Sequence, residues 1–145
     1  MYLFTGWKDH RVDGKDRIVV PTGHVADLKA HGQNTLVLIP GADQPILEAY
    51  PADVFAEISE RQVPNRFEGD QTTRRAFFHT GEKAVLKGPG RITIPKRFLP
   101  FFPNGLVRVC GMKTYLELWD PALWERVIGS RLGGGSAGGA SARSG

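Results

Sequence analysis

Short apolar runs rich in β-branched residues set the hydrophobic pattern of this chain. Residues 18–20 read Ile-Val-Val and residues 92–94 read Ile-Thr-Ile, each preceded by an arginine and followed by a proline. Such runs favour strands, because β-branched side chains pack well on a pleated surface. Five further apolar runs also predict strands, at residues 35–39, 46–50, 82–86, 106–110 and 115–119. The chain is therefore expected to be rich in β-structure.

Segments with helical start signals lie between and after these runs. Residues 52–61 form one such segment, directly after Pro51. Residues 121–131 form another, with Asp120 placed to cap the helix and a proline in its first position. A third helix is expected at residues 70–79, where Asp70 is the N-cap and two adjacent phenylalanines follow two arginines. The remaining segments are expected to be short helices or turns at 24–30 and 96–101, a loop at 62–69, and a flexible Gly-rich tail at 131–145.

Two stretches of the chain resemble each other. Residues 13–21 and 87–95 both read turn residues, an arginine, three β-branched residues and a proline. A second match joins residues 47–51 to residues 116–120, and the offset falls from 74 to 69 residues between the two matches. We attribute this shortening to the strand–strand loop around Gly111. The repeat predicts two diverged copies of one unit.

The repeat leads to a specific expectation for the architecture. A unit of about 45 residues buries too little apolar surface to be stable alone, so the two copies must share a core. We predict an α+β, β-rich fold in which two tandem units form one pseudo-symmetric, barrel-like core with flanking helices. The expected parts are a first unit at 7–54, linker helices at 55–80, a second unit at 81–123, and the end of the C-terminal helix with the flexible tail at 124–145.

The charge is distributed unevenly along the chain. Residues 1–60 carry five Lys and Arg against nine Asp and Glu, whereas residues 61–145 carry fourteen against six. The second half therefore has a net charge of +8, which favours a polyanionic partner.

Other classes of protein are disfavoured. The single cysteine, Cys110, lies in an apolar run and is interpreted as a buried small hydrophobe; the absence of disulfides suits a reducing cytoplasm. The four histidines show no metal-ligand spacing, and no phosphate loop, nucleophile elbow or carboxylate pair is present. No apolar run approaches the ~20 residues of a membrane-spanning helix. We expect no enzyme activity, cofactor, metal, membrane or small-molecule substrate.

A candidate site for DNA lies in the two repeated turns. Arg17 is suited to read a guanine edge, and Asp13, four residues earlier, can orient its guanidinium through a bidentate pair. The alternative is a solvent-exposed ion pair of a hairpin with no role in DNA binding. Basic residues in and after the turns can neutralise phosphates. The full set of candidate DNA-binding residues is Asp13, Lys15, Arg17, Lys87, Arg91, Lys96 and Arg97.

The order of these motifs resembles that of the MraZ family. The chain has Phe4-Thr5-Gly6 near its start, an Asp-x-x-x-Arg motif at residues 13–17, an Arg-Arg-x-Phe-Phe segment between the copies, and copies that end at Tyr-Pro and Trp-Asp. The match runs over residues 3–128. The resemblance implies two SpoVT-AbrB-like units of the swapped-hairpin type, which assemble into rings. It also implies binding to short direct repeats upstream of division and cell-wall genes, as a cytoplasmic, nucleoid-associated repressor.

Two departures from the family pattern are present. The second motif has Lys87 where the family has aspartate, and Thr22-Gly23-His24 replaces a more basic and aromatic helix start. The first departure keeps an alternative open, namely an interaction protein or antitoxin of the same fold that no longer reads DNA. Salt-dependent binding to the DNA upstream of the chain's own gene would separate these functions.

Overall fold

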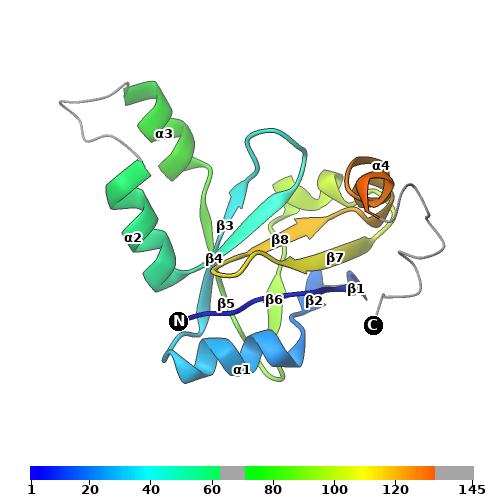
Figure 1. The fold of residues 1–145 in the computed structure, drawn as a ribbon, viewed down its shortest axis with the longest axis horizontal. Coiled ribbons are helices and arrows are strands. Elements are labelled where there is room, and N and C mark those ends of the chain that lie inside the picture. The colour runs from blue at the N-terminus through cyan, green and yellow to red at the C-terminus, as the bar shows by residue number, and fades with distance from the viewer. Residues whose placement is uncertain (63–70, 133–145) are drawn as a thin grey trace.

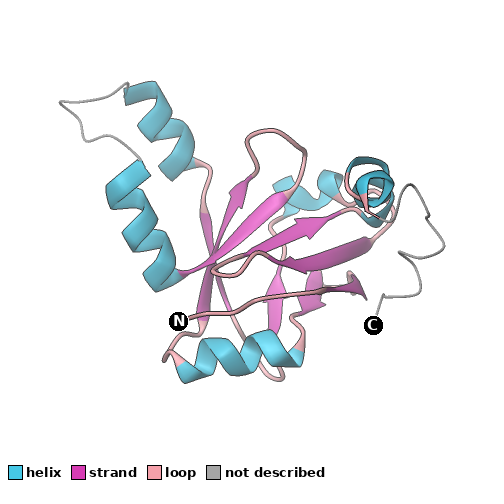
Figure 2. Ribbon diagram, in the orientation of Figure 1, coloured by secondary structure: helices cyan, strands magenta, loops and turns pink. Residues whose placement is uncertain are grey.

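A computed structural model describes residues 1–62 and 71–132 of the chain, as eight strands, four α-helices and two 3₁₀ helices (Figures 1 and 2). The first part contains β1 (Trp7–Arg11), β2 (Arg17–Val19), α1 (Thr22–Ala30), β3 (Thr35–Pro40), β4 (Leu47–Pro51) and α2 (Ala52–Gln62). The second contains α3 (Gln71–His79), β5 (Glu82–Val85), β6 (Arg91–Thr93), η1 (Lys96–Phe101), β7 (Leu106–Gly111), β8 (Leu116–Trp119), α4 (Pro121–Val127) and η2 (Gly129–Arg131). The fold class is α+β, as the sequence predicts.

The strands of the two parts interleave. Six strands form one antiparallel sheet in the order β1-β7-β8-β4-β3-β5, and β2 and β6 form a separate two-stranded ribbon. The counterparts in the two parts of the chain are β1 and β5, β3 and β7, and β4 and β8. When each strand of the large sheet is replaced by its counterpart, the strand order reads the same in the opposite direction. At its centre Glu48 lies opposite Glu117, and in the ribbon Ile18 lies opposite Ile92. The arrangement therefore has an approximate two-fold axis through both sheets.

The main core lies between the six-stranded sheet and a layer made of the ribbon, α1 and η1. Ile18 and Ile92 from the ribbon and Leu28 from α1 are almost completely buried in it. They pack there with residues of the large sheet such as Leu38 and Leu116. Because β1 pairs with β7 and β5 pairs with β3, neither part of the chain completes the sheet alone. This pairing explains how two such small units reach a stable core.

Helices cover the opposite face of the sheet at its two ends. The α2 helix packs near Val37, Ile39 and Tyr50, and α4 packs on Trp119 with its own buried Trp124. Figure 1 shows α3 beside α2, away from the sheet. Phe77 of α3 stacks on Phe55 of α2, with ring centroids 5.3 Å apart.

Most of the predicted elements are confirmed, with shifts at their ends. The 96–101 segment is a 3₁₀ helix, and the C-terminal helix stops at Val127 before a 3₁₀ turn rather than running to residue 131. Asp120 caps that helix as expected, because its carboxylate accepts the N–H of Leu123. The predicted N-cap Asp70, the 62–69 loop except its first residue, and the tail from residue 133 lie outside the described residues.

Two points differ from the sequence-based expectation. Strand β1 was not predicted, because its residues Trp-Lys-Asp-His-Arg show no apolar run. The attribution of the shortened offset to the loop around Gly111 is only partly right. The offset has already fallen from 74 to 71 residues at strands β3 and β7. The reason is that the nine-residue α1, which precedes β3, is replaced by the six-residue η1, which precedes β7. The strand–strand loop accounts for the smaller share.

Candidate nucleic-acid interface

The two repeated turns share two backbone hydrogen bonds, but only the second adds a bond from the Arg91 N–H to the Lys87 carbonyl, and only the second has a positive φ at its first glycine, Gly88. In the first, the Asp13 N–H donates to the Arg17 carbonyl at 2.9 Å, and in the second the Lys87 N–H donates to the Arg91 carbonyl at 2.9 Å. The residue before each arginine has a positive φ, 62° at Asp16 and 105° at Gly90. Glycine adopts this conformation without strain, and aspartate is among the side chains that tolerate it. Each turn thus delivers an arginine to the first position of a ribbon strand.

Both arginines lie on the outward face of the ribbon. Side chains alternate along a strand, so burial of Ile18 and Ile92 places Arg17, Arg91 and Thr93 on the other face. Arg17 lies opposite Thr93, and Val19 lies opposite Arg91. The two arginines are therefore diagonal neighbours, with Cα atoms about 7–8 Å apart. A two-stranded ribbon of this kind fits the major groove of B-DNA.

Asp13 fixes the side chain of Arg17. One carboxylate oxygen accepts the Arg17 Nε–H at 2.9 Å, and the other accepts the backbone N–H groups of Lys15 at 2.8 Å and Arg17 at 2.9 Å. The pKa of Asp13 is lowered below its ordinary value, chiefly by the hydrogen bond from the Arg17 N–H. Within the described part of the chain, Asp13 binds only the Nε of the Arg17 guanidinium. The two Nη nitrogens of Arg17 therefore remain available for a bidentate contact with another group.

The second turn holds its arginine differently. Lys87 replaces the aspartate, and no carboxylate in residues 1–62 or 71–132 forms an ion pair with Lys87 or Arg91. Lys87 is exposed, and Arg91 is half-buried. The two turns therefore present their arginines with opposite charges at the matching position, an aspartate in the first turn and a lysine in the second.

The two basic residues of η1 have partners within the chain. Lys96 forms an ion pair with Asp16 at 2.9 Å, although 88% of its side chain is exposed. Such a pair contributes about 0–1 kcal/mol, so a phosphate can readily replace Asp16. Arg97 is held more firmly, by Glu82, by the Thr80 carbonyl at 3.0 Å and by stacking on Phe98. Lys96 thus links the second part of the chain to the first turn.

One buried charged cluster was not found by sequence reasoning. Arg108 of β7 is 5% exposed and donates to both oxygens of Asp9, at 2.7 and 3.0 Å, and to Glu125 at 3.0 Å. Its guanidinium lies 3.8 Å from the ring centre of Trp7 and 4.7 Å from that of Trp124. The only local signal is a charged residue in the middle of an apolar strand. The cluster is on the far face of the sheet from the ribbon, and it ties β1, β7 and α4 together.

Other kinds of site find little support. Cys110 is buried, and burial raises the pKa of its thiol to about 12, so it behaves as the expected small hydrophobe. Across residues 1–62 and 71–132, no three His, Cys, Asp or Glu side chains are grouped so as to hold a metal ion. Nor is any helix in these ranges long and apolar enough to cross a membrane.

Sequence comparisons place the chain among known proteins. Residues 81–131 match a family model described as "MraZ protein, putative antitoxin-like". The "Transcriptional regulator MraZ" of Bacteroides fragilis is 30% identical over 125 residues, which cover 82% of this chain and 78% of the relative. Its namesake in Herpetosiphon aurantiacus is 33% identical over 121 residues, covering 81% and 80%. That of Phocaeicola vulgatus is 32% identical over 120 residues, covering 80% and 78%.

The matches to these relatives cover about four-fifths of the chain, well beyond the residues 81–131 that the family model matches. The relatives carry the name of a regulator, not of an enzyme, which confirms the expectation of a non-enzymatic protein. The extent of the matches and the resemblance of the ordered motifs lead to the same conclusion: the chain belongs to the MraZ family.

Proposed function

We propose that the chain is a sequence-specific, DNA-binding transcriptional regulator that contacts double-stranded DNA with the outward face of the β2–β6 ribbon. The observation that carries the proposal is the diagonal placement of Arg17 and Arg91 on one exposed antiparallel ribbon. Arginine pairs with guanine in the major groove more often than any other specific contact. The relatives named as transcriptional regulators support the same function.

The residues of the interface divide into two roles. Arg17, oriented by Asp13, reads a base edge, since an immobilised guanidinium loses less entropy on binding. The other cations of the interface, of which Lys96 and Arg97 already pair with carboxylates near η1, contact phosphates and supply affinity without sequence preference. These phosphate-contacting residues are Lys15, Lys87, Arg91, Lys96 and Arg97.

The wider features of the function also belong to this proposal. The two parts correspond to SpoVT-AbrB-like units at 7–54 and 81–123, with linker helices at 55–80, and together they form a barrel-like core. The interleaved strand order supports this division. The protein assembles into a ring-shaped homo-oligomer in the cytoplasm and, at the nucleoid, represses division and cell-wall genes by binding direct repeats in their promoters.

The test of this function is a gel-shift with the promoter of the chain's own operon and a random duplex of equal length. Specific binding should exceed random binding, and both should weaken steeply as salt increases. If neither duplex binds at low salt, the chain is instead an interaction protein or antitoxin of the same fold.

Substitution of Lys87 tests the phosphate role of the second turn. Lys87→Asp should lower affinity for specific and random duplexes alike and flatten the log–log salt dependence by about one unit, because one phosphate contact is lost. The variant also restores a family-like Asp-x-x-x-Arg motif around Arg91. The measurement is the binding constant as a function of salt concentration. An unchanged slope would show that Lys87 does not meet a phosphate.

The aromatic contact between α2 and α3 bears on assembly. No residue of α3 is buried in the described chain, and Phe78 is 38% exposed beside Phe55 and Phe77. We expect this surface to be covered by a neighbouring subunit. Mass measurement in solution at micromolar concentration should give an oligomer, and Phe78→Ser should shift the mass distribution towards monomer. A wild-type protein that is strictly monomeric would contradict the proposed ring.

A further inference from the structure

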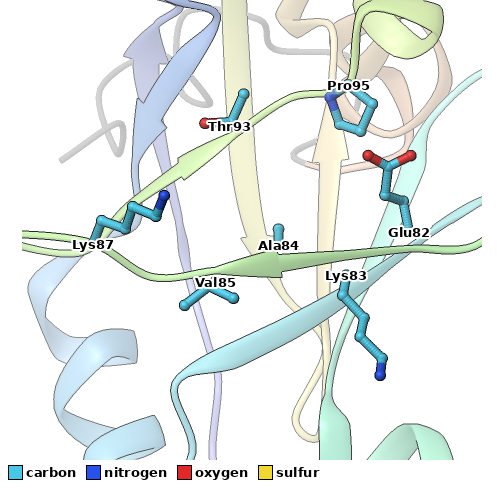
Figure 3. A pocket seen from close by; sticks show the side chains of 7 residues that line it. All are labelled: Glu82, Lys83, Ala84, Val85, Lys87, Thr93 and Pro95. Carbon is cyan, nitrogen blue, oxygen red and sulfur yellow. The ribbon is translucent and has the colours of Figure 1, made fainter.

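A small cavity opens between β5 and β6, beside the second turn. Its volume is about 250 Å³, and its walls include Lys87, Thr93, Val85, Glu82 and Pro95 (Figure 3). Pockets for whole small molecules usually exceed about 300 Å³, so this cavity suits a single chemical group rather than a metabolite.

Hydrogen-bond donors from side chains and from the backbone face the cavity. The Lys87 ammonium is directed towards Thr93, whose exposed side chain carries a hydroxyl (Figure 3). Backbone alternation adds to these donors. The Leu86 N–H binds Asn34 on the β3 side, whereas the Lys87 N–H binds Arg91 on the β6 side. Successive residues of an antiparallel strand point their backbone polar groups to opposite sides, so the Val85 N–H faces the cavity, together with the carbonyl of the same residue.

The acidic residue of the cavity is already neutralised. Glu82 forms an ion pair with Arg97, which in turn is anchored to the Thr80 carbonyl. The ammonium of Lys83 points away from Thr93, on the other side of β5 (Figure 3). Lys87 is thus the only uncompensated charge directed into the cavity from the described residues. An ammonium, a hydroxyl and a backbone N–H together form a suitable environment for a phosphate oxygen.

The first part of the chain has no equivalent cavity chemistry. The counterpart of Lys87 is Asp13, which is occupied by its own turn, and the counterpart of Thr93 is Val19, which has no hydroxyl. The cavity is therefore specific to the second part and does not follow from the repeated fold.

We propose that the β5–β6 cavity binds one backbone phosphate of DNA, through the Lys87 ammonium, the Thr93 hydroxyl and the Val85 N–H. This inference rests on the proposed DNA-binding function and adds to it a defined binding site for one phosphate of the DNA backbone. This phosphate-binding site fixes the position of the ribbon on the duplex, because a phosphate contact sets the register of protein and DNA without reading the base sequence.

The test uses the full chain with Thr93→Val, which nearly preserves shape and removes the hydroxyl. Thr93→Val should weaken binding to a random 16-base-pair duplex by about three- to tenfold. The matched control is Thr5→Val, the same exchange at an exposed threonine outside the ribbon, which should leave binding unchanged. Lys87→Gln should weaken binding about tenfold, and the Lys87→Gln, Thr93→Val double variant should lose less than the product of the two effects, because both act on one phosphate.

Amide chemical shifts identify the ligand. Addition of the duplex should move the Val85 amide signal in the wild type and much less in Thr93→Val. If the wild-type chain binds the duplex but Thr93→Val binds equally well, the cavity proposal is wrong and the proposed function stands. If inorganic phosphate moves the Val85 signal and the duplex does not, the site takes a free anion and the proposal is also wrong. Absence of any duplex binding by the wild type refutes the proposed function itself.

Discussion

Replacement of Arg17 by alanine is expected to weaken binding to the specific operator by about 1–3 kcal/mol, roughly five- to 150-fold, and to relax preference at one base pair. The reason is structural: Arg17 is the ribbon arginine whose side chain a carboxylate, that of Asp13, holds in place. The measurement is the equilibrium affinity for the operator and for duplexes with each single base-pair change in the recognised region.

Two controls separate base reading from charge. Lys15→Ala and Arg91→Ala remove one positive charge each and should weaken specific and random duplexes to a similar extent. Arg17→Ala should differ from both by its larger effect on the specific duplex. If Arg17→Ala leaves affinity and preference unchanged, the pair with Asp13 is a hairpin ion pair alone, which contributes about 0–1 kcal/mol to stability.

The largest effect on stability is expected at Arg108. Arg108→Met should lower the free energy of unfolding by about 2–4 kcal/mol, because it leaves Asp9 and Glu125 without their shared partner beside a hydrophobic cluster. Both carboxylates are about one-third exposed, which keeps the loss below that of a fully buried pair. Thermal and denaturant unfolding measure the change. Specific DNA affinity of the folded variant should remain that of the wild type.

Matched variants identify the cause of that loss. Arg61→Met removes an arginine whose pair with Glu57 is about two-thirds exposed, and should cost less than ~1 kcal/mol. Adding Asp9→Asn and Glu125→Gln to Arg108→Met should recover part of the stability, since no unpaired charge is then left. If the triple variant is no more stable than Arg108→Met, the loss comes from packing between Trp7 and Trp124 rather than from charge.

The sequence predicted the elements that carry their own local signal. The strands at Ile18 and Ile92 were identified from β-branched residues between turns, and the C-terminal helix from Asp120 and Pro121. Strand β1 was missed because it is polar and becomes a strand by pairing with β7 at the sheet edge. Local composition holds no information about such a distant partner.

The candidate site shows the same limit. The Asp13–Arg17 pair was predicted because both residues belong to one turn, and the pair forms, although through Nε alone rather than as the bidentate contact expected. By contrast, Lys96 meets Asp16 across 80 residues and Arg108 meets Asp9 across 99 residues. The repeat indicated two similar units, but not that the first strand of each unit pairs with the third strand of the other. These contacts are set by topology, which spacing along the chain does not encode.

The interleaved sheet also bears on how such a chain can change over generations. Two separate copies of a single unit would form this same sheet as a homodimer, in which every substitution appears twice and on both sides of the axis. Fusion of duplicated copies into one polypeptide removes that constraint. The second turn can then carry Lys87 where the first carries Asp13, and β6 can carry Thr93 at the position where β2 has Val19. A symmetric scaffold can thereby carry two unlike turns, and the proposed interface would fit a duplex in one orientation only.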